Sequence, residues 1–157
     1  MRVSVFVSGC TNRCKGCFQP ETWDFSYGKL YDAAMEDAII KEVSQPYYQG
    51  LTILGGEPFE ILNQPEVLSL IRRMRTDCPD KNIWVYTGFS YGTDLCPGGC
   101  RYTEMTDEIL DSIDILVDGR YIESEKDIQL QFRGSKNQRL IDMKATRQQG
   151  QVVLLDL

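Results

Sequence analysis

The stretch that decides the fold is Val3-Ser4-Val5-Phe6-Val7-Ser8-Gly9-Cys10-Thr11-Asn12-Arg13-Cys14-Lys15-Gly16-Cys17. It begins as an apolar, β-rich run and continues as a loop that holds three cysteines at gaps of three and two residues. A closed structural zinc site uses four ligands, and a fully ligated cubic iron–sulfur cluster also uses four cysteines. Three thiolates therefore suit a four-iron cluster whose last iron stays open for a substrate. An iron with a free coordination position indicates catalysis rather than simple electron storage.

The composition indicates one globular domain that spans residues 1–157. Of the 157 residues, 42% are hydrophobic, which is enough to form a core. The net charge of −6 argues against a nucleic-acid groove, because phosphate binding needs a basic face. No apolar run approaches membrane-spanning length, and Met1-Arg2 leads directly into the first strand without a signal peptide. We therefore expect a cytoplasmic protein that uses its six cysteines as metal ligands or thiols rather than disulfides.

The chain contains no histidine, which excludes several kinds of site. Neither a Ser-His-Asp nor a Cys-His nucleophile system can be built, and no imidazole can serve as metal ligand or base. Any metal must be held by Cys, Asp or Glu. The cysteines of residues 10–17 are therefore the leading candidates for the chemistry.

Strands and helices alternate along the chain, and this order predicts an α/β fold. We expect strands at residues 3–7, 51–54, 83–86, 113–117 and 152–155, and helices at residues 31–43, from about residue 65 onward and at residues 107–112. Such alternation favours a mostly parallel sheet with right-handed crossovers. A complete eight-stranded barrel needs about 250 residues, so we predict a partial, open TIM-like β/α barrel.

Polar or glycine-containing segments follow four of the expected strands. These segments are Ser8–Cys10, Gly55–Glu57, Thr87–Gly88 and Asp118–Gly119. The carboxyl ends of parallel strands meet at one edge of the sheet, where the sites of α/β folds assemble. We therefore expect one site to gather these segments.

Two motifs carry a resemblance to a known family. The spacing of the three cysteines and the turn Gly55-Gly56-Glu57-Pro58 are similar to those of the radical S-adenosylmethionine (SAM) superfamily. Within it, the chain resembles the anaerobic ribonucleoside-triphosphate reductase activating proteins. The matching sequence segments are Val5–Cys10, Cys14–Phe18, Glu21–Trp23, Trp84–Gly88, Val117–Arg120 and Phe132–Arg139. They extend over almost the whole chain, and together with the glycine motif they make the match specific.

The resemblance implies a cofactor chemistry. Cys10, Cys14 and Cys17 would hold a [4Fe-4S] cluster, and SAM would chelate the fourth iron through its amino and carboxylate groups. One electron from the reduced cluster would break a sulfonium carbon–sulfur bond, which gives methionine and a 5′-deoxyadenosyl radical. This radical would take a hydrogen atom from a glycine Cα in the glycyl-radical loop of an anaerobic ribonucleotide reductase large subunit. A flavodoxin-like electron donor is also implied, because no second cluster motif is evident.

The resemblance further suggests which residues contact SAM. Gly55 and Gly56 would let the backbone approach the ligand closely, and Glu57 would accept from the SAM ammonium group. Because Gly16 stands where most of the superfamily has an aromatic residue, Phe18 or Trp23 would touch the adenine instead. The remaining candidates, for SAM and its carboxylate or for the partner's glycyl loop, are Thr87, Asp118, Arg120, Arg133 and Arg139. Family members usually carry a short leader before the first strand, and we expect this chain to lack it.

Two other interpretations remain open. The superfamily includes small enzymes that act on free metabolites, such as deazapurine-forming synthases. The chain could instead be a zinc or iron–sulfur binding module without catalysis, with Cys96 or Cys100 as the fourth ligand. The loop Cys96-Pro97-Gly98-Gly99-Cys100 lies outside the resemblance. We expect it to be flexible with incidental thiols, the alternative being a second metal loop completed by Cys78.

Overall fold

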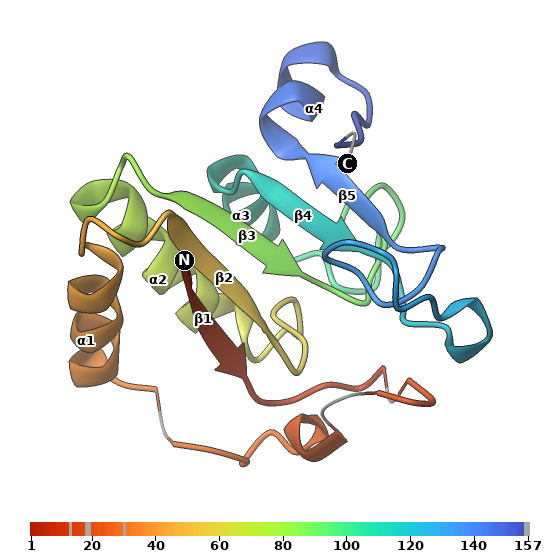
Figure 1. The fold of residues 1–157 in the computed structure, drawn as a ribbon, viewed down its shortest axis with the longest axis horizontal. Helices are drawn as coiled ribbons and strands as arrows, with labels where there is room; N and C mark the ends of the chain where they lie inside the picture. Colours follow the sequence, from red (N-terminus) through yellow and green to blue (C-terminus); the bar gives the residue numbers. More distant parts are fainter. Residues whose placement is uncertain (13, 18–19, 30, 156–157) are drawn as a thin grey trace.

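The computed structural model describes residues 1–12, 14–17, 20–29 and 31–155, and it shows an α/β fold built on one open sheet (Figure 1). The strands lie in the order of their numbers: β1 Arg2–Val7, β2 Gly50–Gly55, β3 Asn82–Tyr86, β4 Ile115–Asp118 and β5 Arg139–Asp142. The first four are parallel, and β5 is antiparallel to β4. The predicted α/β class and mostly parallel sheet are confirmed. That the sheet is a segment of a TIM-like barrel stays a prediction.

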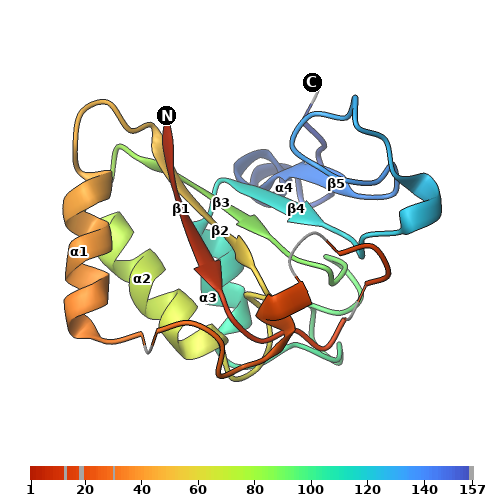
Figure 2. The same ribbon diagram turned by 60° about the horizontal axis from the view of Figure 1, so that its bottom comes forward.

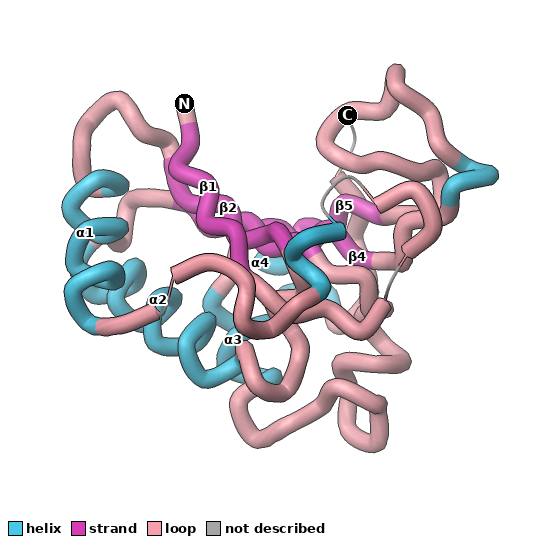
Figure 3. Tube along the Cα trace, turned by 90° about the horizontal axis from the view of Figure 1, so that it is seen from below, coloured by secondary structure: helices cyan, strands magenta, loops and turns pink. Residues whose placement is uncertain are grey.

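Helices cover one face of the sheet. They are α1 Ala33–Val43, α2 Gln64–Asp77, α3 Thr106–Ser112 and α4 Met143–Gln149. Figures 2 and 3 show α1, α2 and α3 on the same side of the strands. The main core lies between these layers, where alternate residues of the central strands are fully buried against apolar side chains of α1 and α2. Within the described part of the chain, no helix combines the length and the apolar character of a bilayer-spanning segment.

Local signals explain where the helices begin. The Asp32 side chain accepts a hydrogen bond from the Met35 backbone N–H at 2.9 Å and so caps α1. Pro65 occupies the first turn of α2, where its missing N–H costs no helical hydrogen bond. The predicted helices and the first three predicted strands are confirmed. Their predicted boundaries agree with the structure within one or two residues.

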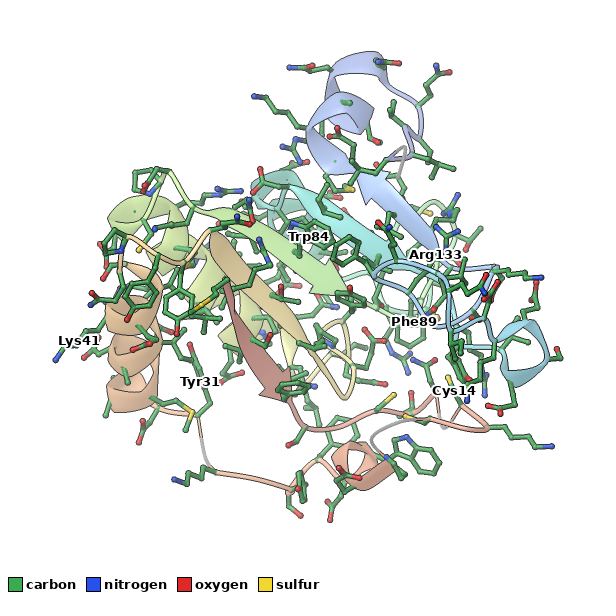
Figure 4. The ribbon with its side chains drawn as sticks, viewed as in Figure 1. Cys14, Tyr31, Lys41, Trp84, Phe89 and Arg133 are labelled. Atoms are coloured by element: carbon green, nitrogen blue, oxygen red, sulfur yellow. The ribbon has the colours of Figure 1, made fainter. Side chains whose placement is uncertain are left out.

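The opposite face of the sheet carries a smaller apolar cluster over β3, β4 and β5. Trp84 and Tyr86 of β3 are partly buried there, and Figure 4 shows the side chain of Trp84 on the sheet. The Phe132 ring lies edge-on to Trp84 with 5.1 Å between the ring centroids. On β1, by contrast, Phe6 points from this face and is half exposed. This face is therefore less covered over β1 than over β3 and β4.

The C-terminal third differs from expectation. The predicted strand at residues 152–155 is wrong, because only Leu154 forms an isolated bridge with Ile141 among the described residues of this segment. The last strand is β5 instead, followed by α4, and neither was predicted. Only the two central residues of β5, Leu140 and Ile141, are apolar and buried, which is too short a run to show alternation. The fourth strand begins at Ile115 rather than at residue 113, because Ile113 caps the end of α3.

The strand register brings the expected strand ends to one edge. Val7 pairs with Gly55, and Tyr86 pairs with Val117. The segments that follow these residues therefore leave the sheet close together. The loop with the three cysteines runs past this edge from the end of β1 (Figure 1).

Candidate functional site

A cavity of about 280 Å³ opens at the carboxyl ends of β1, β2 and β3. All three cysteines of residues 10–17 line it, together with the turn Gly55–Glu57 and with Thr87–Gly88. The structure therefore brings together three of the four strand-end segments that the sequence singled out. The fourth, Asp118–Gly119, does not line the cavity.

The cysteine loop is shaped by short backbone contacts. The Cys17 N–H donates to the Cys14 carbonyl at 3.1 Å, which closes a turn between the second and third cysteines. The Cys10 N–H donates at 3.3 Å to the carbonyl of Trp23, which ends the short 3-10 helix Pro20–Trp23. Trp23, one of the two candidate adenine contacts, also lines the cavity. The other candidate, Phe18, lies outside the described residues.

The donor set suits an iron–sulfur cluster. None of the six cysteines, all in the described part of the chain, is in a disulfide. Cys14 is buried, Cys10 and Cys17 are half-buried, and Figure 4 shows Cys14 beyond the carboxyl ends of the strands. Among the described residues, no three Cys, Asp or Glu side chains converge as the ligands of one metal ion do. In a cluster each thiolate binds a different iron, so three thiols spread along one cavity wall are compatible with it.

Glu57 is the most buried charged group of the site, with 1% of its surface exposed. Its Oε1 accepts from the Gly88 N–H at 2.7 Å and from Asn12 Nδ2 at 3.1 Å. Its Oε2 accepts from Thr87 Oγ1 at 2.6 Å and from the Phe59 N–H at 2.9 Å. Burial raises the pKa of Glu57 to about 7, although the hydrogen bonds act in the opposite direction. The side chain thus joins the end of β3 to the cysteine loop.

Gly55 has a conformation and a position that require glycine. Its φ of 105° lies in the left-handed region, and an added Cβ would stand 2.8 Å from the backbone N and O of Val7. The next two N–H groups, of Gly56 and Glu57, donate to the carbonyls of Val7 and Gly9 at 2.7 Å each. The glycine motif therefore fastens the end of β2 to the end of β1 beneath the cavity.

Asp118 is buried and forms an ion pair with the partly exposed Arg139 instead of facing the cavity. Its side chain is 1% exposed and receives two hydrogen bonds from Arg139, Nε to Oδ1 at 2.9 Å and Nη2 to Oδ2 at 2.5 Å. The Tyr91 N–H donates to the same carboxylate at 2.8 Å. The hydrogen bond to Asp118 raises the pKa of the Arg139 guanidinium. These contacts join β4, β5 and the segment that follows β3.

The two remaining arginines have different surroundings. Arg120 donates through Nη2 to the Asn12 carbonyl at 2.5 Å and so contacts the cysteine loop. The Nε of Arg133 is buried and has no hydrogen-bond partner among the described residues. Arg133 does not line the cavity, but its neighbour Gly134 does. Figure 4 shows Arg133 on the same side of the molecule as Phe89 and Cys14.

A contact between Gly16 of the cysteine loop and Glu123 was not expected from the sequence. Gly16 has a φ of 77°, and a Cβ there would collide with the carboxylate of Glu123. That carboxylate accepts from the Tyr121 hydroxyl at 2.9 Å, and Tyr121 lines the cavity. Burial, Glu123 and the nearby Cys17 all raise the pKa of Tyr121.

The chain has clear relatives among known proteins. Residues 1–141 match the family described as a 4Fe-4S single cluster domain, and the chain belongs to it. The chain is 40% identical to the anaerobic ribonucleoside-triphosphate reductase-activating protein of Haemophilus influenzae, over 87% of this chain and 84% of that protein. It is 37% identical to the protein of the same name from Escherichia coli K12, over 87% and 85%.

A third relative of that name, from Enterobacteria phage T4, is 34% identical over 88% of this chain and 82% of its own length. The chain is a member of the family of anaerobic ribonucleoside-triphosphate reductase-activating proteins. No solved structure matches it.

Proposed function

We propose that this chain is a radical SAM activating enzyme that installs a glycyl radical on the large subunit of an anaerobic ribonucleoside-triphosphate reductase. The observation that carries the proposal is the cavity whose wall holds three thiols beside two strand-end turns. When bound, a [4Fe-4S] cluster and SAM would supply a 5′-deoxyadenosyl radical by one-electron cleavage of the sulfonium bond. A flavodoxin-like protein is the proposed source of the electron.

Cys10, Cys14 and Cys17 are the proposed cluster ligands. All three thiols line one cavity, and the turn between Cys14 and Cys17 is already formed. Their iron–sulfur role is supported by the match to the 4Fe-4S single cluster domain family. Thiolates are the usual protein ligands of such clusters.

The proposed SAM contacts lie on the rest of the cavity wall. Gly55, Gly56, Thr87 and Trp23 line it, and glycine lets the backbone approach a ligand closely. The side chain of Glu57 already accepts four hydrogen bonds, so its contribution to SAM binding would come from holding the wall in place.

Arg133 does not line the cavity itself, but it is bonded to Gly134, which does, and it is the proposed partner of the SAM carboxylate. Its buried Nε has no hydrogen-bond partner among the described residues, and a buried donor of this kind is costly unless a ligand satisfies it. Asp118 and Arg139 would act indirectly, since they are hydrogen-bonded to each other. Arg120 would act through its contact with a backbone carbonyl of the cysteine loop.

The open sheet suits a macromolecular substrate. A glycine Cα in a large partner must enter the site as part of a polypeptide loop, and an incomplete barrel leaves a side open for it. The names of the relatives specify a ribonucleotide reductase as the protein that they activate.

The direct test compares SAM cleavage by Cys14→Ala with cleavage by Cys78→Ala after anaerobic cluster reconstitution and reduction. Cys78 is a buried thiol at the end of α2 and does not line the cavity, which makes it the matched control. We expect 5′-deoxyadenosine from the wild type and from Cys78→Ala, and none from Cys14→Ala. Unchanged 5′-deoxyadenosine production by Cys14→Ala would refute the proposal.

Metal analysis of the same samples tests the binding-module interpretation. About four irons with sulfide per chain would support the proposal. A single zinc per chain would favour a module without catalysis. A glycyl radical on the reductase would argue against an enzyme that acts on a free metabolite.

A further inference from the structure

Glu60 is a buried carboxylate that the cluster and SAM chemistry does not use. It lies in the turn between the glycine motif and α2, and its side chain is 6% exposed. Its Oε1 accepts from both the backbone N–H and the hydroxyl of Thr11, at 2.8 and 2.6 Å. Thr11 follows Cys10 directly, so Glu60 is hydrogen-bonded to the cysteine loop next to its first thiol.

Arg101 completes this contact from another part of the chain. It belongs to residues 90–102, between β3 and α3, which include the Cys96–Cys100 loop outside the family resemblance. Its Nε donates to Glu60 Oε2 at 3.2 Å, and its Nη2 donates to the Thr11 hydroxyl at 2.8 Å. The guanidinium also lies 4.7 Å from the centre of the Phe89 ring. Both the charge and the plane of the Arg101 side chain are therefore held in place.

The backbone around Arg101 is itself fixed. The Arg101 N–H donates to the Asp94 carbonyl at 3.1 Å, and its carbonyl accepts from Gln64 Nε2 of α2 at 2.8 Å. Arg101 thus reaches the cysteine loop from a segment anchored at both sides. A charge-assisted contact from an anchored segment restrains its partner more than one from a mobile surface side chain.

We propose that Glu60 and Arg101 are positioning residues that hold the Cys10 end of the cysteine loop at the sheet edge and slow the loss of iron from the cluster. This inference rests on the proposed function, because it takes Cys10 as an iron ligand. Iron leaves when the loop opens locally, and removal of a charge-assisted restraint makes that opening more frequent. We expect Arg101→Met to lose iron about tenfold faster than the wild type.

The test measures transfer of iron from the anaerobically reconstituted protein to a chromogenic chelator. Arg72→Met is the matched control, because Arg72 makes a two-hydrogen-bond ion pair with Glu108 between α2 and α3, and neither residue lines the cavity. Urea unfolding of the cluster-free variants separates a local effect from a global one. Arg101→Lys keeps the charge but not the planar fork, so its rate should be intermediate.

The outcomes are distinct. Faster iron loss in Arg101→Met, with partial rescue in Arg101→Lys and none of the effect in Arg72→Met, supports the proposal. Equal rates in Arg101→Met and the wild type, or equal acceleration in Arg72→Met, would overturn it. If Arg101→Met does not fold, Glu60→Gln, which keeps the shape of the side chain and removes its charge, gives the same comparison. A wild type that binds no iron would instead refute the proposed function.

Discussion

The free energy of unfolding of the cluster-free protein should depend on pH near neutrality, and Glu57→Gln should remove most of that dependence. Burial raises the pKa of Glu57 to about 7 from its ordinary value of 4.5 in the unfolded chain. The folded state therefore holds the proton more tightly than the unfolded state does. The stability associated with the protonated form is fully present below about pH 4.5 and is lost as the pH rises through about 7.

The size of the effect follows from these two values. Each pKa unit corresponds to about 1.4 kcal/mol, so the rise from 4.5 to about 7 corresponds to roughly 3 kcal/mol. At pH 5 the protonated carboxyl and the amide are both neutral and similar in shape, but the amide nitrogen cannot accept from the Phe59 N–H, so the variant should be less stable by about 1 kcal/mol. Between pH 5 and pH 8 the buried wild-type carboxylate becomes charged, so the stability of the variant relative to the wild type should rise by up to about 3 kcal/mol.

The assay is urea unfolding of the reduced, cluster-free protein at several pH values between 5 and 8. The chain has no histidine, so no other side chain has its ordinary pKa in this window. Glu104→Gln removes an exposed carboxylate before α3 and serves as the control, which should follow the wild type. Parallel pH profiles of Glu57→Gln and the wild type would show that Glu57 does not take up a proton in this range on folding.

Two further predictions concern the residues around the cavity. Asp118→Asn should lower the free energy of unfolding by roughly 1 to 3 kcal/mol, because it removes the counter-charge of the Arg139 guanidinium, whose partial exposure to solvent limits the loss; chemical denaturation measures this, and an unchanged free energy of unfolding would contradict it. Gly16→Ala and Gly150→Ala both place alanine at positive φ, but only at Gly16 would the new Cβ meet another side chain, that of Glu123. Iron content after reconstitution should therefore fall in Gly16→Ala and not in Gly150→Ala, and equal iron content in the two would count against a role for this contact.

Sequence periodicity and strand-end polarity were sufficient for the part of the fold that carries the site. β1, β2 and β3 were predicted because each is an apolar run followed by glycine or small polar residues. The parallel order of the strands then required their ends to meet at one edge. The gathering of Cys10, Gly55 and Thr87 in one cavity follows from that register.

The C-terminal part could not be predicted in the same way. β5 has two buried residues, and its place in the sheet depends on pairing with β4 rather than on its own pattern. The Asp118–Arg139 pair follows from that pairing, which puts the two residues opposite one another in the register. Sequence patterns within one segment do not contain such contacts. For the same reason, nothing in the sequence around Arg101 indicated that it reaches Thr11.

A glycyl radical made on a reductase by means of a cluster at Cys10, Cys14 and Cys17 can be detected by electron paramagnetic resonance of the reductase after anaerobic incubation with the reduced, reconstituted protein and SAM. We expect a carbon-centred radical whose hydrogen splitting is lost when the reductase contains deuterated glycine, and no such signal with Cys14→Ala. Absence of this signal with the wild-type protein, while the cluster is reduced and SAM is bound, would show that this chain does not activate a reductase in this way.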